Sequence, residues 1–222
     1  MISIQVLADF FAAGLLLATF LMMGKIRLVP MLRYFAIASF FLACLGASIS
    51  VMRGEMDFIP AIATILFKVI FIPLIIYFTS KKIPASNHLR MYFRPATTYI
   101  LFAVVLIISA IIVRDFPVNI TEISGGVYFF KSLLFISVAL ILTGILLTIL
   151  RKDLFSQVLG ILTMENGIAA FGLVALNGIP LFLEMGIFFV IITSTVILAI
   201  LIDKVHEVYT VGDTTNLNEL ID

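Results

Sequence analysis

Besides Arg33, which lies only one turn into its run and can extend to the headgroup level, five ionisable side chains lie inside long apolar runs of the 222-residue sequence. They are the groups that could exchange protons or ions: Asp9, Lys68, Lys131, Glu165 and Glu184. A charge near the centre of a bilayer costs at least about 2.5 to 3.5 kcal/mol on insertion scales, so such a residue faces protein or water rather than lipid. Carboxylates and ammonium groups in this setting are typical of proton and ion pathways. We therefore treat all five as candidate pathway residues.

The elements that carry these residues are apolar stretches long enough to cross a bilayer. The chain is 63% hydrophobic and 12% charged, which is about half the charge density usual for a soluble domain. Seven runs reach the length that about 30 Å of hydrocarbon requires: 2–23, 29–51, 58–79, 96–113, 127–150, 154–176 and 181–202. Because a backbone in lipid must satisfy its own hydrogen bonds, the sequence predicts an all-α integral membrane protein with seven transmembrane helices.

The basic residues predict how these helices are oriented. Ten of the 14 lysines and arginines flank the runs on one side, whereas only Arg53 and Arg114 lie on the other. The positive-inside rule then places the N-terminus outside and the C-terminus in the cytoplasm. Residues 1–9 carry no Lys or Arg and lead to no small-residue cleavage site, so the first run is predicted to remain as a span. Segment 80–95 is expected to be a cytoplasmic loop or a helix at the headgroup level.

Lys68 and Glu165 are predicted partners because they lie at the same depth. Lys68 is ten residues into a run entered from outside, and Glu165 is eleven residues into a run entered from inside. At about 1.5 Å per residue both are about 15 Å deep. Pro73 has no N–H to donate to the Val69 carbonyl, so the sequence predicts a helix break beside Lys68. Such a break resembles the discontinuous helices of transporters, and a plain kink is the alternative.

The other three residues are predicted to lie nearer the outer surface. Lys131 and Glu184 each follow the start of a run entered from outside by three or four residues, so both are about 5 Å deep and form a second depth-matched set. Asp9 lies between the two layers, about 10 Å down. The alternative to a pathway is that these side chains form static ion pairs that orient helices.

A stripe of small residues marks the run that carries Glu165. Its members follow one another at steps of four, three, four and three residues: Ser156, Gly160, Thr163, Gly167 and Ala170. This spacing predicts one helix face that packs closely against a neighbour. Glu165 is about 200° around the helix from Thr163, so it is expected to face a different neighbour.

The remaining composition excludes several kinds of site. The single cysteine, Cys44, and the two histidines, His88 and His206, cannot supply an iron–sulfur, bis-histidine haem or zinc site, so no cofactor or metal is expected in this chain. The 14 basic and 13 acidic residues leave no basic surface for nucleic acid. The last run contains no lysine for a retinal Schiff base, and no pair of matching halves indicates a solute transporter.

Four segments together resemble a known family over nearly the whole chain. They are Lys68–Ile75, Gly160–Gly167 with its Met-Glu-Asn-Gly sequence, Leu183–Phe189 and the tail Asn216–Leu220. They resemble the component E membrane subunit of hydrogenase-4-type complexes. The last three runs are also similar to the NuoK subunit of complex I and the MrpC subunit of multisubunit cation/proton antiporters.

The resemblance implies a non-catalytic subunit in the membrane arm of a prokaryotic energy-converting complex, in the cell (inner) membrane. It implies a four-helix part at 1–114 and a NuoK/MrpC-like part at 127–202. The tail at 203–222 is polar, with five acids against Lys204, and is predicted to be a cytoplasmic segment that docks on a neighbouring subunit or frays. Antiporter-like and other membrane-arm subunits would be the partners of the chain. Iron–sulfur clusters, and nickel–iron in a hydrogenase, would belong to partner subunits.

Within that arm the family pattern makes Lys68, Glu165 and Glu184 members of a hydrophilic axis for protons or sodium ions. Two positions differ from the pattern. Val190 stands where family members usually carry Asp, which weakens the expectation of a continuous relay along the seventh helix. NuoK has its buried Glu one turn earlier, at the position of Leu162. The alternative function is a structural connector that assembles and seals antiporter-like subunits without carrying ions.

Overall fold

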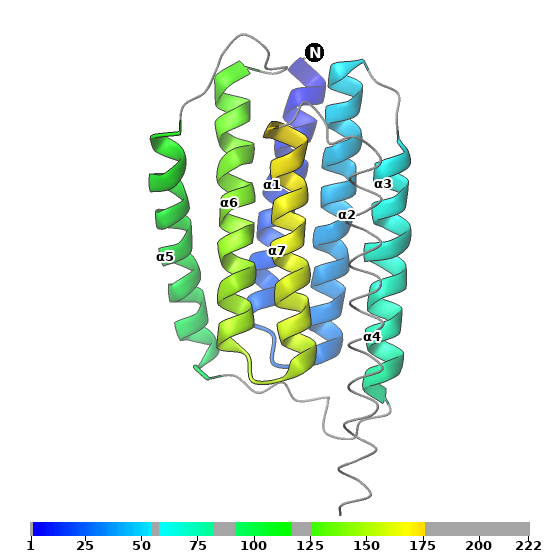
Figure 1. The fold of residues 1–222 in the computed structure, drawn as a ribbon, viewed down its shortest axis with the longest axis vertical. Coiled ribbons are helices and arrows are strands. Elements are labelled where there is room, and N and C mark those ends of the chain that lie inside the picture. Colours follow the sequence, from blue (N-terminus) through cyan, green and yellow to red (C-terminus); the bar gives the residue numbers. More distant parts are fainter. Residues whose placement is uncertain (1, 55–57, 82–91, 117–125, 176–222) are drawn as a thin grey trace, which may run out of the picture.

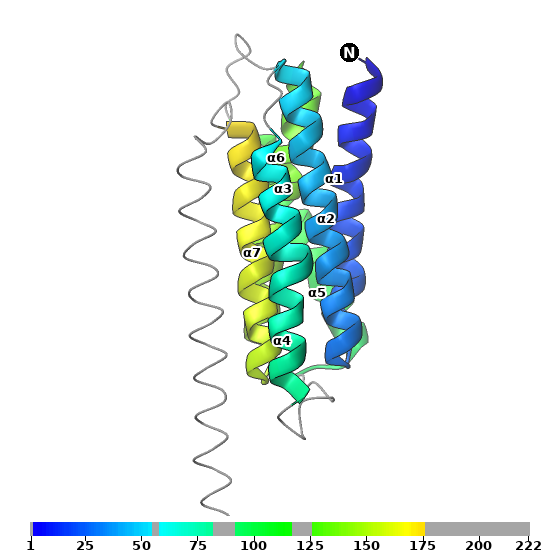
Figure 2. The ribbon, with the colours of Figure 1, turned by 90° about the vertical axis from the view of Figure 1, so that its right-hand side faces the viewer.

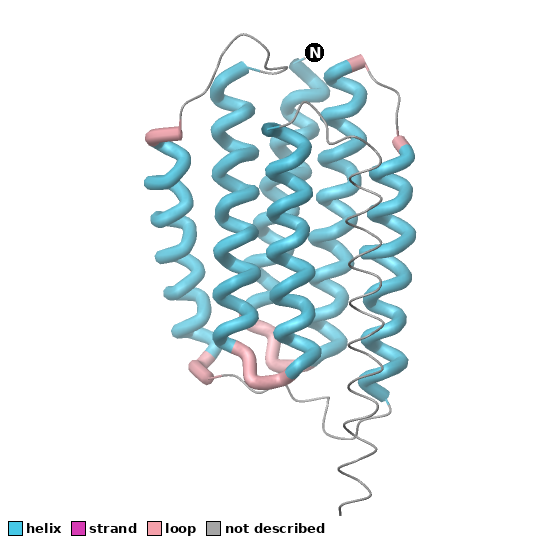
Figure 3. Tube along the Cα trace, in the orientation of Figure 1, coloured by secondary structure: helices cyan, strands magenta, loops and turns pink. Residues whose placement is uncertain are grey.

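The computed structural model describes residues 2–54, 58–81, 92–116 and 126–175 (Figure 1). These residues form helices joined by short turns and by segments outside the described part (Figure 3). The helices are α1 (Ile2–Met23), α2 (Leu28–Arg53), α3 (Ile59–Thr64), the π-helix η1 (Ile65–Phe71), α4 (Ile72–Lys81), α5 (Pro95–Arg114), α6 (Gly126–Leu150) and α7 (Leu154–Ala175).

The helices stand side by side as an antiparallel bundle. α1 packs along α2, α6 packs along α7, and the two pairs contact each other through α1 with α6 and α2 with α7. α3, η1 and α4 follow one another as one continuous rod on one side of these four helices, and α5 lies on the other side (Figures 1 and 2). The described helices before and after residue 120 therefore pack in one bundle.

Among the described residues, five helices are long and apolar enough to cross a membrane: Ile4–Met23, Leu28–Met52, Ile59–Phe78, Pro95–Arg114 and Val127–Leu150. α7 has a similar length and carries the polar residues Gln157, Glu165 and Asn166. The helices agree with the first six predicted runs to within two residues at each end. The predicted seventh run, 181–202, lies outside the described residues, as do Glu184, Val190 and the tail.

The predicted alternation of basic and non-basic connections matches the two ends of this bundle. Lys25 and Arg27 follow α1, Arg94 precedes α5, and Arg151 and Lys152 join α6 to α7, all at the lower end in Figure 1. We call this the basic end, and the opposite end, which carries the start of α1, the N-terminal end. Which end faces the cytoplasm stays a prediction from the positive-inside rule.

Two apolar clusters fill the bundle, one toward each end. The basic-end cluster includes Phe35 of α2 and Leu162 of α7. The N-terminal-end cluster includes Leu42 of α2 and Ala170 of α7. Along both helices the residues between these clusters include buried polar side chains, which places a polar layer near the middle of the bundle.

Glycines allow the backbones of α6 and α7 to approach closely. A Cβ atom added to Gly144 would lie 2.6 Å from the Gly160 carbonyl oxygen, and one added to Gly167 would lie 2.7 Å from the Ile141 nitrogen. Real Cβ contacts essentially never reach these distances, so both sites exclude any larger residue unless the helices separate. Gly160 and Gly167 of the small-residue stripe thus face α6, whereas Ser156 contacts Met31 of α2.

We expect Gly144→Ala to lower the free energy of unfolding by about 1 to 3 kcal/mol, because the new methyl group pushes α6 away from α7. Gly46→Ala is the control, since its Cβ would lie 3.8 Å from the Leu173 side chain, an ordinary van der Waals contact. Denaturant titration of both variants in mixed micelles measures the difference. Equal stability of the two variants would contradict this account of the α6–α7 contact.

Candidate functional site

Lys68 and Glu165 form an ion pair between η1 and α7. The Lys68 ammonium contacts Glu165 Oε2, and only 1% of the lysine side chain and 10% of the glutamate side chain are exposed. Lys68 lies nine residues after the start of α3, and Glu165 lies eleven residues after the start of α7. At about 1.5 Å per residue both are near the middle of the bundle. The structure thus brings together the two residues whose depths match.

Asn166 extends the pair into a network of four side chains. Lys68 Nζ donates to Asn166 Oδ1 at 3.0 Å, and Asn166 Nδ2 donates to Ser39 Oγ of α2 at 3.3 Å. A lysine ammonium can only donate, so the amide oxygen must face it and the amide NH₂ is left for Ser39. Asn166 and Ser39 are almost fully buried. The network therefore joins three helical elements: η1, α7 and α2.

The backbone around Lys68 is a π-helix rather than a break at Pro73. The Ile72 N–H donates to the Phe67 carbonyl, five residues earlier. Pro73 has no N–H, so position 73 donates neither to the Lys68 carbonyl, its π-helical acceptor, nor to the Val69 carbonyl, its α-helical acceptor. The helix continues through Pro73 as α4. The predicted break is thus a wider turn that includes Lys68 itself, and π-helical turns are frequent at functional sites.

This network lies where the two apolar clusters meet. On α2, Ser39 stands between Phe35 of the basic-end cluster and Leu42 of the N-terminal-end cluster. On α7, Glu165 stands between Leu162 and Ala170 in the same way. The ion pair is thus held in apolar surroundings, where electrostatic interactions are strong and an unpaired charge is costly.

The other predicted pathway residues do not join this network in the described part of the chain. Lys131 Nζ donates to the Arg114 carbonyl oxygen at 3.2 Å, at the C-terminal end of α5, where a cation is favoured by the helix dipole. Asp9 Oδ1 accepts from the Ser132 hydroxyl at 3.4 Å. Glu184, the predicted partner of Lys131, lies outside the described residues. A pathway role for these three residues stays a prediction.

Arg151, which the sequence indicated only as one of the basic residues that flank the apolar runs, is a buried cation. It is fully buried, and its Nη2 donates to the carbonyl oxygens of Met23 at 2.7 Å and Lys25 at 2.9 Å. It thereby satisfies carbonyls at the end of α1 and joins the α1–α2 turn to the α6–α7 turn. Burial lowers the pKa of the Arg151 guanidinium, and the Asp153 carboxylate partly opposes that shift. Its role is structural, at the basic end.

Two members of the network, Asn166 and Ser39, were not predicted as site residues. Asn166 follows Glu165 directly in an apolar run, and a carboxamide in that position needs partners. Ser39 lies eleven residues after the start of α2, at the same height as Glu165 in α7. Depth arithmetic applied to uncharged polar residues would have selected both.

Comparison with known proteins agrees with a membrane subunit. The chain is similar to component E of hydrogenase-4. The Escherichia coli protein is 25% identical to it over 211 residues, which cover 94% of this chain and 94% of the relative. Uncharacterized protein Rv0085 of Mycobacterium tuberculosis is 25% identical over 226 residues, covering 98% of this chain and 97% of the relative. No family model and no solved structure matches.

These similarities support a distant relationship to a hydrogenase-4 membrane subunit. Together with the five apolar helices they indicate a multi-pass membrane protein. Both relatives align with nearly the full length of the chain, so the similarity covers the helices that carry Lys68 and Glu165.

Proposed function

We propose that this chain is a non-catalytic membrane-arm subunit of a complex I-related, hydrogenase-4-type energy-converting complex, in which Glu165 exchanges a proton under the influence of Lys68. The observation that carries the proposal is the buried Lys68–Glu165 ion pair in the middle of the bundle. Its electron-transfer centres would belong to partner subunits in the prokaryotic inner membrane. The resemblance of its last three runs to NuoK and MrpC subunits is consistent with this place.

Proton exchange at Glu165 requires one proton and a change in the distance between Glu165 and Lys68. While Lys68 contacts Glu165, the ammonium stabilises the ionised carboxylate. When the two separate, burial favours the neutral acid, so Glu165 takes up a proton, and renewed contact releases it. Asn166 can hold the ammonium during separation because its Oδ1 already accepts from Lys68. The π-helical turn supports such movement, since position 73 fixes neither the Lys68 nor the Val69 carbonyl.

We expect Glu165→Gln to abolish ion translocation coupled to electron transfer while the complex still assembles. Glutamine has nearly the shape of glutamate and can accept from Lys68, but it cannot exchange a proton. Ion uptake by inverted membrane vesicles measures the effect, and a blue native gel measures assembly. A carboxylate introduced by Gln157→Glu would not replace that of Glu165, because Gln157 lies near the basic end. Thr163→Val, one turn from Asn166, serves as the control. Full pumping by an assembled Glu165→Gln complex would refute the proposal.

A structural connector is the second candidate, favoured by the close α6–α7 contact and by the burial of the whole network. In that case the ion pair holds η1 against α7 and does not change during turnover. Charge-neutralising variants would then reduce assembly on the native gel, and whatever complex remained would pump ions at the normal ratio to electron transfer.

A further inference from the structure

Asp9 lies on a face of α1 that a neighbouring helix covers only in part. Asp9, Ala13, Phe20 and Gly24 share this face, because they follow one another at steps of four, seven and four residues. Toward the basic end α5 covers it. The centroid of the Phe20 ring lies 4.8 Å from that of Tyr99 and 5.2 Å from that of Phe102, and Gly24 lies so close to Tyr99 that a Cβ there would collide with the tyrosine side chain.

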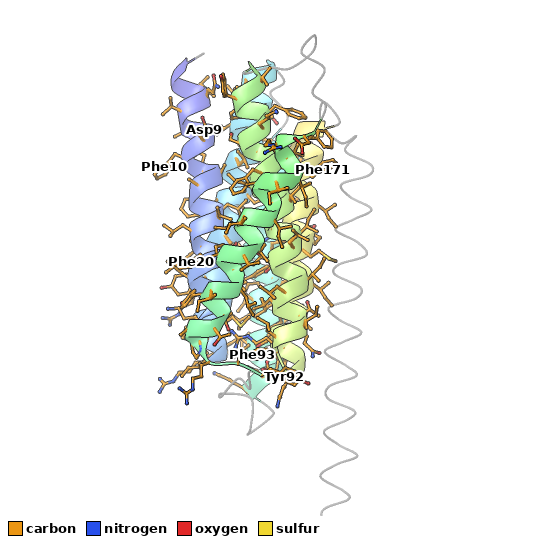
Figure 4. The ribbon with its side chains drawn as sticks, turned by 90° about the vertical axis from the view of Figure 1, so that its left-hand side faces the viewer. Asp9, Phe10, Phe20, Tyr92, Phe93 and Phe171 are labelled. Atoms are coloured by element: carbon orange, nitrogen blue, oxygen red, sulfur yellow. The ribbon has the colours of Figure 1, made fainter. Side chains whose placement is uncertain are left out.

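Toward the N-terminal end no helix of the described part of the chain covers this face. α5 diverges from α1 in this direction, and Asp9 is on the part of α1 from which it diverges (Figure 4). Asp9 and Ala13 are exposed there, as is Ala110 of α5, which shares a face with Tyr99. Phe10 is exposed at the edge of this face, and the centroid of its ring lies 6.4 Å from that of the Phe41 ring of α2. α6 contributes Ser132 behind this opening. The small side chains of Ala13 and Ala110 leave room for another helix to approach closely.

The Asp9 carboxylate lacks a strong donor within the described part of the chain. Its hydrogen bond from Ser132 is 3.4 Å long, and the same hydroxyl has a 2.9 Å contact with the Phe129 carbonyl. A serine hydroxyl has one hydrogen, so the shorter contact competes with Asp9 for it. Lys131, which precedes Ser132 on α6, donates to the Arg114 carbonyl. Asp9 is seven residues into α1, about 10 Å from its end, which is too deep for a carboxylate to face hydrocarbon.

We propose that this open face of α1 and α5 is the interface for a transmembrane helix of a partner subunit, and that this helix places a lysine or arginine against Asp9. The inference rests on the proposed membership in a multisubunit complex. Charge complementarity selects the occupant, because an intramembrane carboxylate is stabilised by a cation from a neighbouring helix. The predicted run 181–202 of this chain cannot supply it, since it contains no Lys, Arg or His.

Photo-crosslinking from single cysteines tests the interface. Cys44 is the only cysteine, so Cys44→Ser provides a clean background. Phe10→Cys and Ile107→Cys are each labelled with benzophenone maleimide in the intact membrane complex. Phe10 on α1 is 62% exposed and Ile107 on α5 is 61% exposed at a similar depth, but Ile107 points away from the bundle. We expect Phe10→Cys to crosslink to a partner's transmembrane peptide that contains Lys or Arg, and Ile107→Cys to give lipid adducts.

The charge is tested in the same background. Asp9→Lys should lower the Phe10→Cys crosslink about tenfold or more, because like charges then face each other, and exchanging the partner's cation for Asp should restore it. Asp9→Asn, which fits the fold with little change, should give an intermediate yield. Lipid adducts or peptides of this chain itself from Phe10→Cys, in a complex that runs intact on a native gel, would overturn the interface alone. A chain that migrates at its own mass would overturn the proposed function.

Discussion

Lys68→Met is expected to lower the free energy of unfolding by about 3 to 5 kcal/mol, the largest effect of any substitution considered. Without Lys68, Glu165 must either keep an unpaired charge in apolar surroundings or take up a proton, and either state costs free energy relative to the ion pair. Met is similar in length to Lys, so little of the loss comes from packing. The loss should be smaller at low pH, because protonated Glu165 needs no counter-charge. Denaturant titrations in mixed micelles at several pH values measure both effects.

The double variant Lys68→Met/Glu165→Gln is the control for this prediction. Replacing both charges is often close to neutral, because neither buried charge then remains. We therefore expect the double variant to be clearly more stable than Lys68→Met alone. If the two single effects simply added in the double variant, the residues would not interact and the network would be wrong.

Asn166→Leu is expected to cost about 2 to 4 kcal/mol, the second largest effect. Leu has a similar volume but leaves Lys68 without its 3.0 Å acceptor and Ser39 without its donor. Thr163→Val is a matched control one turn away, because the Thr163 hydroxyl donates only to the Leu159 carbonyl of its own helix. The same titrations compare the two variants. A Thr163→Val loss as large as that of Asn166→Leu would show that α7 tolerates no polar-to-apolar change at this depth.

Much of the fold could be predicted because a bilayer allows few solutions. Apolar runs of sufficient length must be helices, and basic residues between them alternate between the two ends. The pairing of Lys68 with Glu165 followed from depth alone, since each run has a known direction. The same arithmetic paired Lys131 with Glu184, which lies outside the described residues, and it missed the Arg114 carbonyl that Lys131 contacts, because depth says nothing about which helices are neighbours.

The parts of the site that could not be predicted depend on rotation about the helix axes. Glu165 and Asn166 are 100° apart on α7, yet both reach the Lys68 ammonium because η1 lies opposite the edge between them. Only the tertiary arrangement of α7 and η1 reveals this. The π-helix could not be predicted either, since Pro73 indicates that one helical hydrogen bond is lost but not how the backbone of the preceding turn adapts. Arg151 was missed because its burial depends on two turns that meet only in the folded chain.

Infrared difference spectroscopy of the intact complex would detect a change in the protonation of Glu165 during turnover. We expect a carboxylic C=O band that differs between the resting and the turning-over complex, disappears in Glu165→Gln and persists in both states in Lys68→Met. A difference spectrum that Glu165→Gln leaves unchanged, in a complex that still pumps ions, would contradict this expectation.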